Sequence, residues 1–203
     1  PKATTPKTET HVKEGTLKIP EFYDTVKTLG QTVDVDYYLP GCPPPVKLIA
    51  GAVDAIASNK LPPKGSVLAP LKAVCDECQR KRENKKIGKI YRVYEKAPEP
   101  EKCLLEQGIL CMGLATRSGC GAQCLNVDMP CTGCGGAAPN VPEQGAAMIS
   151  ALASILGYDG EPGKTKYTEK EIEELISQIK DPVGTFYMYS LPASILKRKV
   201  IKK

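Results

Sequence analysis

The stretch SGCGAQCLNVDMPCTGCGG, residues 118–136, carries four cysteines among glycines, a proline and one acidic residue. They are Cys120, Cys124, Cys131 and Cys134. The stretch has the periodicity of neither a helix nor a strand. Thiols crowded into so irregular a segment indicate that something other than regular secondary structure holds it. Four thiolates around a metal centre supply such a nucleus.

The cysteine-rich region extends well beyond this stretch. Residues 67–140 are dominated by Gly, Pro and Cys, apart from a short helix expected at 99–107, and so long an irregular segment needs cross-links if it is to be ordered. Cys-x2-Cys pairs at 75–78 and 131–134 each let two thiolates reach one metal centre from a single turn. We therefore predict two four-thiolate sites. The nine cysteines of the chain are Cys42, Cys75, Cys78, Cys103, Cys111, Cys120, Cys124, Cys131 and Cys134.

The cysteine spacing favours iron–sulfur clusters, with zinc as the alternative metal. The N-terminus has no apolar signal-peptide core, so we expect a cytoplasmic, reducing location, where disulfides do not persist. Zinc also accepts four cysteine ligands, and CTGCGG also fits the pattern of a zinc knuckle. In that case the chain would be an interaction module whose loops are held together by zinc. The apolar neighbours Leu104, Leu110 and Met112 favour a redox cluster whose potential depends on burial. If the sites hold iron–sulfur clusters, a stand-alone ferredoxin-like electron carrier is an alternative function for the chain.

The segment before the cysteine-rich region reads as a strand followed by a helix. VDVDYYL at 33–39 alternates apolar and polar residues, as a half-buried strand does. PGCPPP at 40–45 ends it, and apolar residues then recur at helical spacing from Val46 to Ala57. Cys42 thus lies in a loop at the carboxyl end of a strand, where open α/β sheets place their ligands.

Two amphipathic helices are predicted after the cysteines. The first covers 143–156, with Gly157 at its C-terminal cap. The second covers 168–180 and begins with a capping box of Thr168 and Glu171.

The remaining composition excludes several classes of protein. Residues 1–16 are polar and predict a loop, and the absence of an initiator Met leads us to expect a chain cut at its N-terminus from a longer polypeptide. No apolar run is long enough for a membrane span. A net charge of +5, no Trp and two Phe do not suit a nucleic-acid binder.

Three polar features are further candidates for a functional role. His11 is the single histidine and reads as a solvated loop residue. Glu106 reads as a surface carboxylate of a helix. The basic run RKRENKK at 80–86 directly follows Cys78. It is either a solvated face or a docking site for an acidic electron acceptor.

Four motifs, in this order, resemble the small subunit of nickel–iron hydrogenases: GCPPP at 41–45, CDEC at 75–78, CLLEQGILCMG at 103–113 and PCTGCGG at 130–136. The likeness is greatest to the G-type (gamma) subunit of the methanogen deazaflavin-non-reducing hydrogenase associated with heterodisulfide reductase. DPVGTFYMYSLPASILKR, 181–198, resembles its C-terminal tail. The resemblance implies an oxidoreductase subunit without catalytic residues, relaying electrons from the nickel–iron site of a large subunit to an iron–sulfur and flavin acceptor complex.

The resemblance also implies a role for each cysteine. Cys42 corresponds to a ligand of the proximal cluster, whose other ligands, an N-terminal Cys-x2-Cys and one later cysteine, are absent from this chain. Many relatives supply three medial cysteines to a 3Fe–4S centre, but Cys124 offers a fourth thiolate, so we expect a 4Fe–4S cluster. The implied distal ligands are Cys75, Cys78, Cys103 and Cys111, and the medial ligands are Cys120, Cys124, Cys131 and Cys134.

The expected fold class follows from the same resemblance. Residues 1–66 are expected to be the C-terminal part of a flavodoxin-like α/β domain, including its last strand–helix unit. An α-rich, irregular iron–sulfur cluster domain is expected at 67–165. A C-terminal helix and tail at 166–203 are expected to contact a partner.

Overall fold

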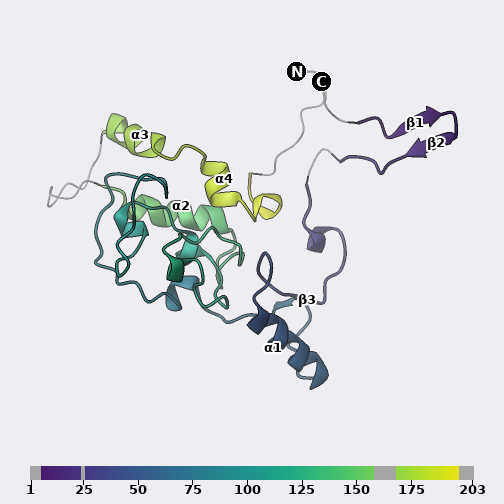
Figure 1. Ribbon diagram of the computed structural model, residues 1–203, viewed down its shortest axis with the longest axis horizontal. Helices are drawn as coiled ribbons and strands as arrows, with labels where there is room; N and C mark the ends of the chain where they lie inside the picture. Colours follow the sequence, from purple (N-terminus) through teal and green to yellow (C-terminus); the bar gives the residue numbers. More distant parts are fainter. Residues whose placement is uncertain (1–5, 24–25, 158–167, 197–203) are drawn as a thin grey trace.

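The computed structural model describes residues 6–23, 26–157 and 168–196 (Figure 1). The cysteine-rich chain from about residue 70 to 140 lies together with three C-terminal helices in one part of the molecule. Helix α1 and strand β3 lie to one side of this part, and the hairpin of β1 and β2 extends away from both.

The N-terminal hairpin pairs β1, Glu9–Val12, with β2, Gly15–Lys18, in antiparallel register. All eight of its residues are exposed. The loop predicted for residues 1–16 is therefore wrong for 9–12 and 15–16, because local pairing across a tight turn at Gly15 (φ 142°) supplies order without an apolar pattern. Residues 1–5 lie outside the described part.

A parallel pair of very short strands flanks helix α1. Strands β3, Tyr37–Tyr38, and β4, Ser66–Val67, are parallel, and α1, Val46–Ala57, connects them. The predicted strand at 33–39 is thus much shorter than expected, since β4 offers backbone partners to two residues only. The predicted alternation persists in the exposure pattern of residues 34–39.

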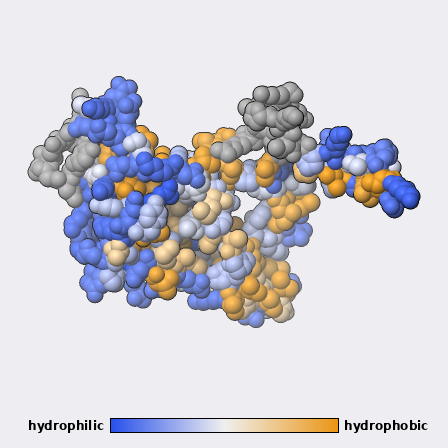
Figure 2. Space-filling model, turned by 45° about the horizontal axis from the view of Figure 1, so that its top comes forward, coloured by the Kyte–Doolittle hydropathy of each residue, from blue (hydrophilic) through white to orange (hydrophobic). Residues whose placement is uncertain are grey.

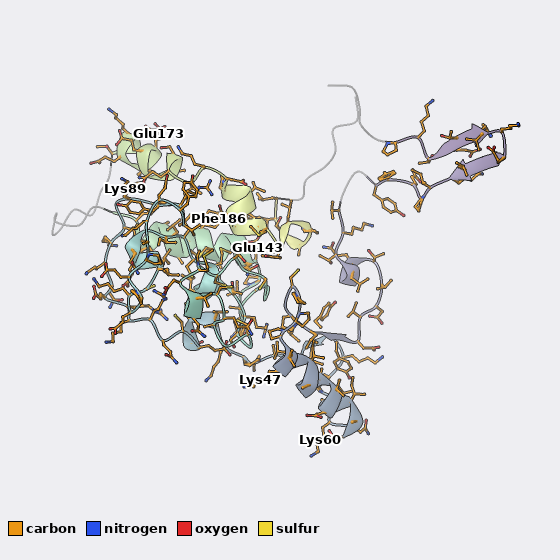
Figure 3. The ribbon with its side chains drawn as sticks, viewed as in Figure 1. Lys47, Lys60, Lys89, Glu143, Glu173 and Phe186 are labelled. Carbon is orange, nitrogen blue, oxygen red and sulfur yellow. The ribbon has the colours of Figure 1, made fainter. Side chains whose placement is uncertain are left out.

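Helix α1 covers the predicted residues, Val46–Ala57, but none of them is buried. Val46 is 82% exposed and Ile56 62% exposed. Figure 2 shows the resulting apolar patch over α1. In Figure 3, Lys47 and Lys60 mark the two ends of this helix. Within the described residues, its apolar stripe therefore faces solvent.

The cysteine-rich part contains no α-helix in its described residues from 67 to 140, only short 3-10 turns. These are η2, Val74–Asp76; η3, Leu105–Gln107; η4, Met112–Ala115; and η5, Leu125–Val127. An earlier 3-10 turn, η1, covers Leu29–Gln31. The short helix predicted at 99–107 is reduced to η3. Backbone groups before η3 bond elsewhere: Cys103 N donates to Lys81 O at 2.8 Å, and Glu99 O and Lys102 O accept from Arg80.

The C-terminal helices cover the cysteine-rich part. They are α2, Gln144–Ile155; α3, Glu169–Ser177; α4, Pro182–Tyr187; and the turn η6, Leu191–Ala193. The capping box of Thr168 and Glu171 is confirmed, although α3 ends three residues short of the predicted 180. Gly157 does not cap α2, since its N–H donates to Ile87 O at 3.0 Å.

One apolar core joins these helices to the cysteine-rich turns. Met148 and Leu152 of α2 are 0% and 2% exposed, and Gly145 lets the Tyr187 ring of α4 lie directly against the helix backbone. Figure 3 labels Glu143 and Phe186 in this region. Among the described helices, none has the length and apolar character needed to cross a bilayer. Further core residues are Val74, Ile87, Leu104, Ile109, Met112 and Leu125.

Candidate metal centres

Four cysteines converge where η2 meets η4. The pKa of Cys75 is raised to about 11, mainly by burial; Arg82 opposes the rise, and the neighbouring thiols of Cys103, Cys78 and Cys131 contribute to it. Interactions of this kind act only between close groups. The structure thus brings together the predicted first set of thiols, Cys75, Cys78, Cys103 and Cys111.

Cys111 is the most buried thiol of this first set. It is 7% exposed, and burial raises its pKa to about 11. Backbone hydrogen bonds from Gly113 and Cys131 act in the opposite direction, the latter with N···Sγ 3.4 Å. Such N–H groups stabilise a thiolate or a metal-bound sulfur rather than a neutral thiol.

Gly113 forms one wall of the first set. A Cβ at this position would lie 3.3 Å from Cys75 Sγ and 3.6 Å from Cys111 Sγ. A methyl group here would be in tight contact with Cys75 Sγ, which would have to move by a few tenths of an ångström. Close backbone approach of this kind is a common reason for glycine beside a bound group.

The second set lines a cavity of about 370 Å³. Burial raises the pKa of Cys134, and nearby Cys124, Cys120 and Cys42 raise it further. Cys124 is exposed, whereas Cys131 is buried. The four thiols predicted as the second set all lie on this cavity: Cys120, Cys124, Cys131 and Cys134.

Cys42 lies beside the second set. The PGCPPP loop at 40–45 forms one wall of the same cavity, and a backbone hydrogen bond from Cys42 reaches the thiol of Cys134. Its own side chain is exposed. The structure therefore places Cys42 next to predicted medial residues, and its assignment to a proximal cluster stays a prediction.

Cys131 lies between the two sets. Burial raises its pKa to about 12, and both Cys111 of the first set and Cys134 of the second contribute to that rise. Gly133 and the hydroxyl of Thr116 hydrogen-bond to its sulfur and oppose the rise. The two sets are thus neighbours, with one buried thiol at their boundary.

Gln144 is a supporting residue that sequence reasoning missed. Its side chain is buried, and its Nε2 donates to Gly133 O at 3.0 Å, Gly136 O at 3.1 Å and Thr116 Oγ1 at 3.1 Å. The first turn of α2 thereby holds the loop that carries Cys134. The available signal was a polar residue at a position that the helical pattern places against the core.

The structure corrects the interpretation of the basic run at 80–86. The side chain of Arg80 is 6% exposed and bonds to backbone oxygens and to Asp128, so it is not available to a partner. Lys86 Nζ donates to Ser154 O at 2.7 Å. Lys81 and Arg82 remain exposed. The run is therefore only in part a solvated or docking face.

Two other polar residues have structural contacts. Glu106 accepts hydrogen bonds from Glu83 N at 2.6 Å and Asn84 N at 2.9 Å, so it fixes the turn after the basic run. His11 is exposed on the hairpin, with Nδ1 2.8 Å from Thr16 Oγ1.

The two sets supply thiol donors of the kind that an iron–sulfur cluster requires. All nine cysteines are free thiols. In the described part of the chain, no three side chains of His, Cys, Asp or Glu converge closely enough to hold a single metal ion. Two groups of four neighbouring thiols, with backbone N–H groups directed at sulfur, fit the donors of an iron–sulfur cluster.

Comparison with known proteins points to a hydrogenase component. No family model matches the chain. It is 39% identical over 197 residues to the G-type iron-sulfur subunit of the F420-non-reducing hydrogenase of Archaeoglobus profundus, a match that covers 94% of this chain. It is 47% identical over 130 residues to the G-type subunit of the same kind of hydrogenase from Methanothermus fervidus, and covers 98% of that protein. The chain belongs to the G-type subunit family of F420-non-reducing hydrogenases.

The relatives differ in length from this chain. The chain spans 58% of the Archaeoglobus profundus protein and 58% of the corresponding protein of Methanothermobacter thermautotrophicus, to which it is 39% identical over 188 residues. Membership of this family confirms the resemblance at the level of the family.

Proposed function

We propose that the chain is the electron-transfer part of a nickel–iron hydrogenase and holds two 4Fe–4S clusters. The main support for this proposal is the arrangement of eight thiols in two adjoining sets around Cys131, in a member of the G-type hydrogenase subunit family. The Archaeoglobus profundus relative, named as an iron-sulfur protein, supports the proposal. Cys75, Cys78, Cys103 and Cys111 would hold the distal cluster, and Cys120, Cys124, Cys131 and Cys134 the medial one.

In this proposal, the residues of the chain bind the clusters and shield them from water. When bound, an iron–sulfur cluster supplies a site that takes up and releases one electron at a time. The thiolates hold it, and backbone N–H groups such as that of Cys131 toward Cys111 Sγ draw electron density from sulfur. Leu104 and Met112, 1% and 3% exposed, exclude water from the first set. Burial, sulfur hydrogen bonds and exclusion of water are the means by which a protein sets such potentials.

The donor and acceptor are part of the same proposal. The resemblance of the motifs implies that electrons come from a large subunit with a nickel–iron site. They leave to the iron–sulfur and flavin subunits of a heterodisulfide reductase complex in the cytoplasm. Cys42, in the wall of the second cavity, would contribute to the proximal cluster at the large-subunit end.

Metal analysis of the anaerobically purified complex tests the proposal. We expect about eight irons and about eight acid-labile sulfides in the two sites of this chain, with a visible charge-transfer band. Stoichiometric zinc without such a band would instead establish the zinc-stapled interaction module. Reconstitution of the isolated chain with iron and sulfide separates its contribution from that of the other subunits.

A further inference from the structure

The CDEC turn at 75–78 contacts the loop that carries Cys120. The Glu77 carboxylate accepts hydrogen bonds from Gly119 N, at 3.0 and 3.1 Å from its two oxygens, and from Gly121 N at 2.9 Å. These two N–H donors belong to the residues on either side of Cys120. A carboxylate inside the first motif thus fixes the backbone of a thiol of the second set.

Arg80 makes the matching contact with the other half of the same loop. Its Nε and Nη2 each lie 3.3 Å from Leu125 O, and Nη2 also forms an ion pair with Asp128. Leu125 directly follows Cys124. The guanidinium therefore holds the backbone next to the exposed thiol of the second set.

The same guanidinium reaches the first set. Arg80 Nη1 donates to Glu99 O at 2.8 Å and to Lys102 O at 3.0 Å, and Lys102 directly precedes Cys103. One side chain, 6% exposed, thus joins backbone that carries a thiol of each set. Arginine suits this task because its planar fork donates several hydrogen bonds in fixed directions.

The loop at 118–128 depends on such contacts because its own structure is sparse. Its regular part is the three-residue turn η5, and Asn126 supplies one side-chain bond, to Gly121 O at 3.0 Å. The left-handed conformations along it are strained for non-glycine residues, which favours opening when external contacts are lost. Residues with positive φ in the loop are Gly119, Gly121, Ala122 and Asp128.

We propose that Glu77 and Arg80 are positioning residues that hold Cys120 and Cys124 in place from the turn of the first set. The inference rests on the proposed function, and it adds that the two cluster sites are assembled through one another. Each contact is a hydrogen bond involving a charged group, and the loss of one such bond changes an opening equilibrium by roughly tenfold. Neither residue touches a sulfur in this role.

The experiment compares variants of the complex that contains this chain, purified anaerobically. Glu77→Gln keeps the side-chain shape but presents an NH2 group where two N–H donors need an acceptor. Arg80→Lys keeps the charge but loses the fork. Asp76→Asn is the matched control for Glu77→Gln. It also removes one negative charge, but the Asp76 carboxylate accepts a hydrogen bond from Ala73 N, at 2.8 Å, and not from the loop that carries Cys120. Lys81→Gln is the control for Arg80→Lys, because Lys81 is exposed and its Nζ lies 3.5 Å from Oε2 of Glu101, which is also exposed.

Two measurements separate positioning from general destabilisation. The first is the EPR spectrum of the oxidised protein, in which a 3Fe–4S signal reports the loss of one iron from the medial site. The second is the rate of iron loss to a chelator. We expect both test variants to show the 3Fe–4S signal and to lose medial iron roughly tenfold faster. Glu77→Gln should keep the distal signal, whereas Arg80→Lys should also alter it, because Arg80 bonds to the backbone that precedes Cys103. We expect the controls to stay within about twofold of wild type.

Wild-type spectra and metal content test the proposed function separately from this inference. Wild-type protein without iron would overturn both. Wild-type protein with two clusters, together with test variants whose EPR spectra and iron-release rates match those of the controls, would overturn the positioning roles alone. If the Arg80→Lys protein does not accumulate, the EPR spectrum and iron-release rate of Glu77→Gln test the inference. Equal damage to both clusters in that variant would also overturn the inference, because general unfolding would then explain it.

Discussion

The backbone N–H of Cys131 donates to the sulfur of Cys111 across 3.4 Å, so a residue of the second thiol set supports a residue of the first. Both side chains are 7% exposed, and burial raises the pKa of each. Without metal these positions favour neutral thiols. A bound cation reverses this preference, because coordination deprotonates a thiol outright.

The metal-free chain should lose stability as the pH rises above about 9. In the unfolded chain thiols ionise near pH 9, whereas the folded protein keeps Cys75 and Cys111 protonated to about pH 11 and Cys131 to about pH 12. A raised folded-state pKa gives stability that is fully present below pH 9 and lost as the pH approaches these values. The free energy of unfolding should fall by up to about 1.4 kcal/mol per pH unit per thiol.

Urea unfolding followed by circular dichroism at pH 8 and pH 10 measures this effect. Cys111→Ala should reduce the fall, because it removes one of the buried titrating groups. Iron-loaded protein should show no such fall in this interval, since its thiolates are held by the cluster. A metal-free chain equally stable at both pH values would contradict the burial of these thiols.

Gly113→Ala should damage the first thiol set. The new Cβ would lie 3.3 Å from Cys75 Sγ and 3.6 Å from Cys111 Sγ, so one sulfur must move by a few tenths of an ångström. We expect a shifted EPR spectrum and potential of the distal cluster with the medial signal retained. Gly51→Ala is the control, because Gly51 lies within α1 with open space around it. An unchanged distal potential would argue against a cluster in contact with this wall.

Cys124→Ser should convert the medial site to a three-iron cluster. Cys124 is the exposed fourth thiol on the second cavity, so its removal leaves three thiolates. The oxidised protein should then show a 3Fe–4S EPR signal and lose about one iron. Gln123→Ser is the matched control, since Gln123 precedes Cys124 at an exposed position of the same cavity and has no thiol to lose. An unchanged spectrum in Cys124→Ser would make Cys124 a spectator thiol.

Much of the regular structure was predictable from local pattern. The spacing of apolar residues predicted α1 and α2 closely, and the capping box at Thr168 placed the start of α3. The strand at 33–39 was overestimated, since strand length depends on a neighbour, and β4 pairs with two residues only. The hairpin at 9–18 was missed because it has no buried face and hence no apolar signal.

Cysteine spacing and the family resemblance predicted two sets of thiols, and their assignment to two clusters stays a prediction. The residues that support these sets could not be predicted. Arg80 bonds to backbone oxygens 19 to 45 residues away in sequence, and a backbone oxygen leaves no trace in residue type. Its position at the head of a basic run suggested a surface charge. Glu77 escaped notice because its partners are backbone N–H groups. Gln144 could have been noticed as a polar residue on the buried side of α2.

Gln144→Met should destabilise the loop at 133–136. The substitution removes a buried amide that donates to Gly133 O and Gly136 O and leaves these carbonyls without that partner. Removing one partner of a buried hydrogen bond costs about 1–3 kcal/mol. We expect a lower melting temperature and faster iron loss from the medial site. Gln123→Met, at an exposed position of the second cavity, should leave both unchanged.

Charge reversal at Lys81 and Arg82 should slow reduction of the protein acceptor. Both are exposed, and Arg82 lies close enough to Cys75 to lower its pKa, so these charges lie near the first thiol set. Arg80 is left intact because it is buried. Exposed charges chiefly steer encounter, so the double variant should also flatten the dependence of the rate on ionic strength.

Two comparisons make this last prediction decisive. Hydrogen uptake with a small artificial dye should barely change in the Lys81→Glu, Arg82→Glu variant, because a dye needs no docked protein surface. Lys60→Glu should alter neither rate, since Figure 3 shows Lys60 at the end of α1 that points away from the cysteine-rich part. Equal losses with dye and protein acceptor would show that the substitutions damage the cluster site itself. Full activity with both acceptors would show that the exposed part of the basic run is only a solvated face.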